Sequence, residues 1–206
     1  MPQTTEENLK ACRPKKRRYS SYKGKISDAP ENLVNRDLHA DGPNVLRLTD
    51  ITEFRIPAGK SYLSPVIDCF DGMPISWAIS TSPSAEMANS SLLGACSQLK
   101  EGEHPTGHSD RGCHYRWPGW IGICDEHGIV RSMSRKGCSP DNSAMEGFFC
   151  RLKVGFFYGQ DRKGRSIGRF METLGDCIER HDERRIEVSS GGLSPNQYRR
   201  SLGLAA

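Results

Sequence analysis

Two stretches decide the fold of this chain: HSDRGCHY at residues 108–115 and SMSRKGCSPDNSAMEGFFCRLK at residues 132–153. They contain the acids Asp110 and Glu146, with thirty-five residues between them. A third acid, Asp50, lies upstream in the segment RLTDITEF. A site that uses all three has to be assembled by folding, because its members come from distant parts of the chain.

The residues around Asp50 predict β-structure. Residues 46–56 alternate apolar and polar side chains and contain β-branched Thr and Ile, which is typical of a strand. Residues 62–70 and 73–80 are the second and third expected strands, joined by short turns that contain glycine. Three consecutive strands with short connections predict an antiparallel meander.

Helices and strands are expected to alternate after the meander. Ser84 is placed to cap a helix that ends near Gly102, and Pro118 to open a helix over residues 117–127. Between these two helices, residues 105–108 are expected to lead into a short buried strand or loop that carries Asp110. A short strand over 129–133 follows the second helix, and a helix that carries Glu146 comes next. A further helix is expected over residues 168–180. This order predicts an α/β fold with a five-stranded mixed sheet and helices on both faces.

The length of 206 residues suits one medium domain. Net charge is only +4, but residues 10–27 contain eight Lys or Arg and no acid. Such a run is typical of an arm that meets polyanions, and also of a solvated tail. We therefore expect a basic flexible arm or linker over 1–30, a core domain over 31–188 and a C-terminal tail over 189–206.

The eight cysteines favour neither disulfides nor zinc. The N-terminal residues contain no apolar segment of the secretory kind, and no run approaches the roughly 18 apolar residues of a membrane span. A cytoplasmic protein with reduced thiols is expected. Cys113, Cys124, Cys138 and Cys150 form no CxxC pair, so a zinc site is not expected.

The acids suit magnesium chemistry, but chemistry alone does not select them. Mg²⁺ prefers oxygen ligands, and two such ions can activate and stabilise the oxygens of phosphodiester transfer. Asp50 could equally be a solvent-facing strand residue, Asp110 a turn residue and Glu146 a solvated helix residue. Asp68 and Asp125 are just as suitable by chemistry, so the residue pattern leaves the choice open.

Six motifs in order resemble the catalytic half of bacterial insertion-sequence transposases, relatives of retroviral integrases with an Asp–Asp–Glu active site. They are LTDITEF, YLSPVIDCFDG, HSDRGCHY, SMSRKGCSPDN, EGFFCRLK and GGLSPNQYR. The resemblance extends from Tyr19 to Leu204. The gap between the second and third acids is also that of the family.

This resemblance implies a ribonuclease H-like fold in which Asp50, Asp110 and Glu146 are the catalytic, metal-binding residues. They would hold two Mg²⁺ ions, which Mn²⁺ can replace. The implied reaction is DNA 3′-end cleavage followed by strand transfer, during DNA transposition and integration. The implied partners are transposon ends, target DNA and further copies of the chain on DNA, in a nucleoid-associated cytoplasmic setting.

Two basic residues are candidates for DNA contact next to these acids. Lys153 is seven residues after Glu146, two helical turns along the same face, where it resembles a basic residue of the family that contacts DNA. Arg111 follows Asp110 directly. The alternatives are a solvated lysine and a simple ionic partner for Asp110.

The segment before the helix of Glu146 supplies three more candidates. Arg135 and Lys136, with Ser134, are expected to bind the DNA backbone. Asn142 lies one turn before Glu146, where it would either orient that carboxylate or cap the helix. His108 and Ser109 are expected to support the turn of Asp110 without taking part in the chemistry.

The chain also departs from the family pattern. Members usually have helix-turn-helix segments before the catalytic half, often acquired by frameshift fusion, whereas about thirty basic residues precede the core here. The chain is therefore expected to be fused to, or partnered with, an upstream helix-turn-helix protein. His181 and Asp182 replace an aromatic–polar pair of the family. Two other functions remain open: a truncated, non-catalytic DNA-binding or assembly partner, and a metal-dependent nuclease acting on RNA–DNA hybrids.

Overall fold

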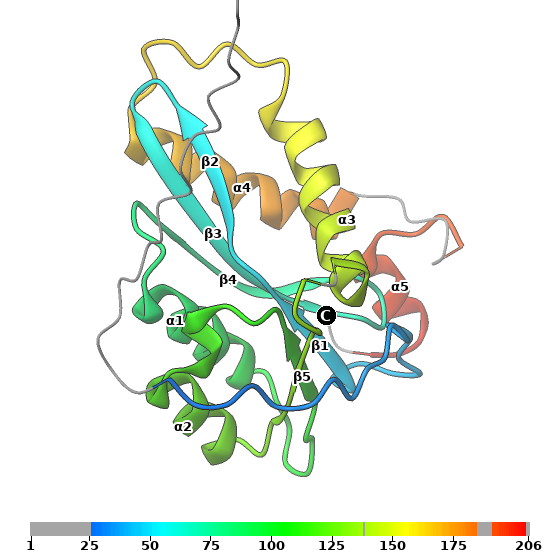
Figure 1. The fold of residues 1–206 in the computed structure, drawn as a ribbon. Coiled ribbons are helices and arrows are strands. Elements are labelled where there is room, and N and C mark those ends of the chain that lie inside the picture. Colours follow the sequence, from blue (N-terminus) through cyan, green and yellow to red (C-terminus); the bar gives the residue numbers. More distant parts are fainter. Residues whose placement is uncertain (1–25, 138, 185–190, 205–206) are drawn as a thin grey trace, which may run out of the picture.

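A mixed sheet with helices on both faces forms the molecule (Figure 1). The computed structural model describes residues 26–137, 139–184 and 191–204. The strands are β1 (Leu46–Thr49), β2 (Thr52–Ile56), β3 (Gly59–Asp68), β4 (Pro74–Ser80), β5 (Thr106–Ser109) and β6 (Val130–Met133). The α-helices are α1 (Ala85–Cys96), α2 (Pro118–Glu126), α3 (Ser143–Leu152), α4 (Ile167–Arg184) and α5 (Pro195–Ser201).

The sheet has the order β2-β3-β1-β5-β6, with β4 paired along the other side of β3. β1 and β2 both pair antiparallel with β3, at opposite ends of that longer strand. They are thus two halves of one interrupted strand. β5 runs parallel to β1, and β6 runs parallel to β5. The expected mixed sheet with five strand positions is confirmed.

The interruption of the first strand falls at Asp50 and Ile51. The Asp50 side chain accepts a hydrogen bond from the Ile51 backbone N–H at 2.7 Å, which competes with regular strand pairing. Leu48 and Phe54, on either side, are fully buried in the same core cluster. The expectation of one continuous strand over residues 46–56 was therefore wrong, because a local side-chain bond breaks it.

Two apolar layers fix the helices to the sheet. α3 and α4 cover one face, where Phe148, Phe170 and Leu174 are buried against residues of β1, β2 and β3. α1 and α2 cover the other face, where Leu92 and Trp120 are buried in a second cluster. Burial on both faces confirms the expected two-sided packing.

The helix boundaries follow local signals, with one change. The Ser84 hydroxyl accepts from the Met87 N–H and caps α1, and Pro118 is the first residue of α2. Asn142 occupies the N-cap position of α3, but its side chain makes no capping bond. α3 continues directly into a π-helix, η3 (Lys153–Phe157), whose wider turn carries the chain away from the helix axis.

The C-terminal segment contains α5, which the expectation of a tail did not include. Ser194 and Gln197 form a reciprocal capping box at its start. Arg199 is buried. Its guanidinium lies 2.6 Å from Asp71, in the β3–β4 turn, and 3.0 Å from Asp68, the last residue of β3. These ion pairs fasten α5 to the sheet.

The expected arm meets the core near its end, where the Ser27 carbonyl accepts from the Arg116 guanidinium at 2.8 Å. Residues 1–25, the rest of the arm, lie outside the described residues, as do the side chains of His181 and Asp182. The boundaries at residues 30 and 188 stay predictions. None of the helices in the described ranges combines the length and apolar character needed to cross a bilayer.

Candidate active site

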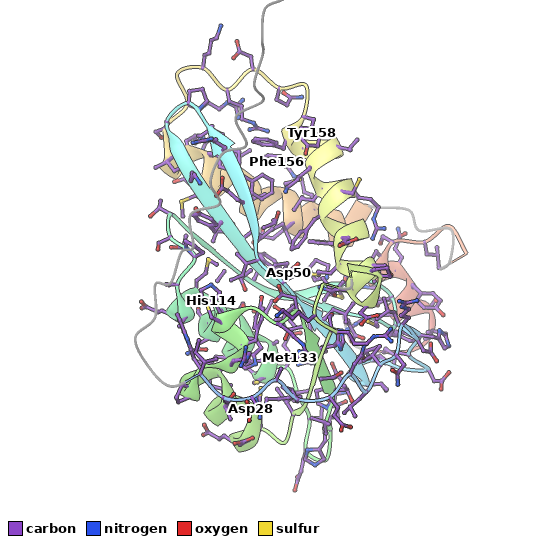
Figure 2. The ribbon with its side chains drawn as sticks, viewed as in Figure 1. Asp28, Asp50, His114, Met133, Phe156 and Tyr158 are labelled. Carbon is purple, nitrogen blue, oxygen red and sulfur yellow. The ribbon has the colours of Figure 1, made fainter. Side chains whose placement is uncertain are left out.

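Asp50, Asp110 and Glu146 line one cavity of about 430 Å³. Asp50 follows β1 and Asp110 follows β5. Because these neighbouring strands are parallel, both acids lie at the carboxyl ends of their strands, on the same side of the sheet. Glu146 reaches the cavity from α3. Figure 2 shows Asp50 near the centre of the molecule, where β1 and β2 meet, beside the start of α3.

Burial and negative charge act together on Asp50. Burial and, to a smaller extent, the nearby charges of Asp110 and Glu146 raise the pKa of this carboxyl to about 7. The hydrogen bond from the Ile51 N–H and the positive charge of Lys153 oppose this shift. The cavity therefore concentrates negative charge that a bound cation would neutralise.

The oxygen atoms of this cavity fit a hard cation. Asn142 lines the cavity together with the three carboxylates. This residue is 5% exposed, and its buried Oδ1 atom has no hydrogen-bond partner. An all-oxygen set of this kind suits Mg²⁺. Within the described ranges, no three acidic, histidine or cysteine side chains have already converged closely enough to hold an ion. Binding of one ion by all three acids would thus require them to approach one another.

Backbone contacts fix the carboxylate of Asp110. Its Oδ1 atom accepts from the Gly112 N–H at 2.8 Å. A Cβ atom at residue 112 would lie only 2.8 Å from the same oxygen, so the close approach requires glycine. Arg111 donates from Nε to the Ser134 carbonyl at 2.9 Å and ties the end of β5 to the segment after β6.

The other predicted residues lie at or beside the cavity. Arg111, Arg135, Lys136 and Asn142 line it. Lys153 is half-buried at the start of η3, with Nζ 5.5 Å from the centroid of the Phe54 ring. Its charge reaches the cavity, since it lowers the pKa of Asp50. Basic groups thus border the acids, as an anionic substrate requires.

The two rival acids lie elsewhere. Asp68 is fully buried in the ion pair with Arg199, and Asp125 is exposed on α2. Neither lines the cavity. The structure therefore separates them from the acids that the family resemblance selected.

A buried polar layer under the cavity was not anticipated in this detail. His108 is fully buried, with Nδ1 2.8 Å from the Ser132 hydroxyl and Nε2 3.1 Å from the Ser134 hydroxyl. Asp141 is also fully buried and binds Asn32, Arg36 and Arg135. The partners of Asp141 include residues more than a hundred positions upstream, so no local pattern identifies them.

The comparisons with known proteins agree with this geometry. The integrase core domain family matches residues 40–139. A transposase-like protein of Haemophilus influenzae is 40% identical over 185 residues, which cover 90% of this chain and 84% of the relative. The chain belongs to the integrase-core transposases of insertion sequences.

Other members of this family are longer. A probable transposase of insertion sequence element IS1353 from Shigella flexneri is 49% identical, over 97% of this chain and 39% of the relative. The putative transposase InsK of IS150 from Escherichia coli is 40% identical, over 90% of this chain and 65% of the relative. The chain thus spans about two-fifths and two-thirds of the length of these two transposases.

Solved structures establish the fold. A chain in the intasome of simian T-cell lymphotropic virus matches with a TM-score of 0.60 at 20% identity, over 78% of this chain and 55% of that chain. The HTLV-2 integrase catalytic core domain, in complex with magnesium, matches with a TM-score of 0.56 at 17% identity, over 76% of this chain and 96% of that chain. The expected ribonuclease H-like fold is confirmed.

Proposed function

We propose that this chain is the catalytic domain of a transposase that cuts DNA 3′ ends and joins them to DNA. One observation carries the proposal: acids from three separate elements line a single cavity bordered by basic residues, in a chain of the transposase family. Their common position has a direct explanation in phosphodiester chemistry.

Asp50, Asp110 and Glu146 are proposed to hold two Mg²⁺ ions, which Mn²⁺ can replace. The carboxylate oxygens of the three acids in one cavity and the raised pKa of Asp50 support this assignment. Bound ions would supply Lewis-acid stabilisation of the attacking and leaving oxygens. Asn142, with its unpartnered buried oxygen, is proposed to support the carboxylate of Glu146 or a water beside it.

The residues of the chain place the DNA for two successive displacements. A water oxygen first attacks a phosphodiester at the transposon end, and the 3′ oxygen leaves with a proton. That 3′ hydroxyl then loses its proton and attacks a second phosphodiester, in the same end or in target DNA. The bond from that phosphorus to the 3′ oxygen of the attacked strand breaks, and the leaving oxygen takes up a proton. Arg111, Arg135, Lys136 and Lys153 are proposed to bind the phosphates and fix the strand at the cavity. No covalent protein–DNA intermediate is needed.

Assembly with further partners is also proposed. The intasome neighbour supports an oligomer on DNA. The greater length of the relatives supports a further segment, which we propose is a fused or separate helix-turn-helix protein that selects the transposon ends. The basic sequence before residue 27 supports added contact with DNA. The proposed location is the cytoplasm, in association with the nucleoid.

A strand-transfer assay tests this function. The protein, with an upstream DNA-binding segment supplied where ends must be found, is mixed with pre-cut ends of the parent element and Mn²⁺. Joined product is expected from the natural chain and from Glu101→Gln in an exposed turn. Glu146→Gln should lose about 100-fold or more of the activity, as expected when stabilisation of the transition state is removed.

The assay also separates the rival functions. Retained joining in Glu146→Gln would contradict the assignment of that residue. No joining by any chain would favour the non-catalytic assembly partner. Cleavage of RNA–DNA hybrids without joining of DNA ends would favour the nuclease.

A further inference from the structure

Asp141 joins three segments of the chain below the cavity. Its carboxylate is fully buried and lies in a short 3₁₀ helix, η2 (Ser139–Asn142), directly before α3. Oδ2 accepts from Asn32 Nδ2 at 2.9 Å and from the Arg135 backbone N–H at 2.9 Å. Oδ1 accepts from Arg36 Nε and from Arg135 Nη2, both at 3.1 Å. We call Asn32, Arg36, Arg135 and Asp141 the Asp141 network.

Two of the joined segments form the cavity itself. Arg135 belongs to the loop of residues 134–137, all four of which line the cavity. Asp141 precedes Asn142, which also lines it, and lies five residues before Glu146. The network therefore sets the position of the cavity loop relative to the start of α3.

The third segment comes from before the sheet. Besides Asn32 and Arg36, the backbone N–H of Leu33 donates to the Ser132 hydroxyl at 3.0 Å. Ser132 in turn contacts buried His108, two residues before Asp110. Residues 32–36 are thus fastened both to the strands that carry Asp110 and to the loop before Glu146. Residues 32–36 therefore connect the segment that leads to Asp110 with the segment that leads to Glu146.

We infer that Asp141 is a positioning residue: it holds the helix of Glu146 and the cavity loop against residues 32–36, so that Glu146 and Asp110 face the same ion. The inference rests on the proposed function. A buried carboxylate surrounded by guanidinium groups fixes geometry strongly, because displacing it leaves uncompensated charges. Outer hydrogen-bond partners of metal ligands act in this way.

The molecule offers a matched control for ordinary stabilisation. Asp71 is likewise a buried carboxylate paired with a guanidinium, that of Arg199 at 2.6 Å. It lies in the β3–β4 turn and does not line the cavity. Asp71→Asn should lower stability through loss of an ion pair, as Asp141→Asn does, without affecting the position of Glu146.

The test compares Asp141→Asn and Asp71→Asn by calorimetric titration with Mn²⁺ and by amide hydrogen exchange. Asp141→Asn should bind Mn²⁺ about 10- to 100-fold more weakly than the natural chain, and residues 139–152 should exchange faster. Asp71→Asn should bind Mn²⁺ normally and show faster exchange in residues 195–201. Equal Mn²⁺ affinity in both variants, or unchanged exchange in residues 139–152, would overturn the inference.

Arg36→Met provides a second variant that keeps the buried carboxylate. The Arg36 side chain is 54% exposed, so the fold tolerates its replacement. Mn²⁺ affinity should fall between those of the natural chain and Asp141→Asn, and full retention would contradict the role of residues 32–36. Amide hydrogen exchange in residues 139–152 reports on how firmly the start of α3 is held, and it needs neither metal nor DNA. A natural chain that neither bound Mn²⁺ nor joined ends would count against the proposed function, while exchange would still decide the inference.

Discussion

Asp50 lies in the two-residue gap between β1 and β2 and shares its cavity with two other acids. Burial, with the nearby charges of Asp110 and Glu146, raises its pKa to about 7. These like charges oppose one another in the metal-free protein. The repulsion between these acids therefore lowers the free energy of unfolding of the metal-free protein.

Replacing one acid should therefore stabilise the metal-free protein. Asp110→Asn removes a negative charge and retains the oxygen that accepts from the Gly112 N–H. We expect the free energy of unfolding to rise by about 0.5–1 kcal/mol, and the melting temperature by about 1–4 °C. Differential scanning calorimetry in EDTA measures both. Glu101→Gln is the control, and a lower melting temperature for Asp110→Asn would contradict the account.

Lys153 should act on DNA as a phosphate contact. Lys153→Ala removes one positive charge beside the cavity, so binding to transposon-end DNA should weaken for every sequence. The slope of log affinity against log salt concentration should become shallower by about 1. Fluorescence anisotropy over a salt series measures this slope. Lys100→Ala, an exposed residue in the connection before β5, should leave the slope unchanged; an equal change in both variants would exclude a specific role for Lys153.

At the scale of elements, α5 should contribute strongly to stability. Arg199→Ala leaves Asp71 and Asp68 buried without their guanidinium partner. The free energy of unfolding should fall by about 3 kcal/mol, the loss typical of a broken buried ion pair. Urea denaturation measures it. The neighbouring Arg200 is exposed, so Arg200→Ala should change stability by less than about 0.5 kcal/mol; similar losses in both variants would contradict this role for Arg199.

Most elements could be predicted from local patterns, and the exceptions have physical causes. Alternation over residues 46–56 predicted one strand, because Leu48 and Phe54 do share a face. The break at Asp50 depends on its own hydrogen bond to Ile51, which alternation does not reveal. α5 had a usable signal in the capping box of Ser194 and Gln197. For the π-helix after α3, the only signal in the sequence was Gly155, a residue that weakens a regular helix.

At the scale of the whole molecule, the parallel pairing of β1 with β5 brings Asp50 and Asp110 to one edge, and α3 closes the cavity from the other side. The family motifs predicted these three acids, which composition and spacing alone did not distinguish from Asp68 or Asp125. The structure adds what sequence could not supply. Asp141 binds Asn32 and Arg36 across more than a hundred residues, and such partners follow only from the folded chain.

Asp50, Asp110 and Glu146 are proposed to form one metal site. The most direct test is anomalous diffraction from crystals of the chain with Mn²⁺ and a pre-cut transposon end. We expect Mn²⁺ in the cavity, bound by carboxylate oxygens of all three acids, and no Mn²⁺ there in Glu146→Gln crystals. Mn²⁺ bound elsewhere, or held without Glu146, would contradict this proposal.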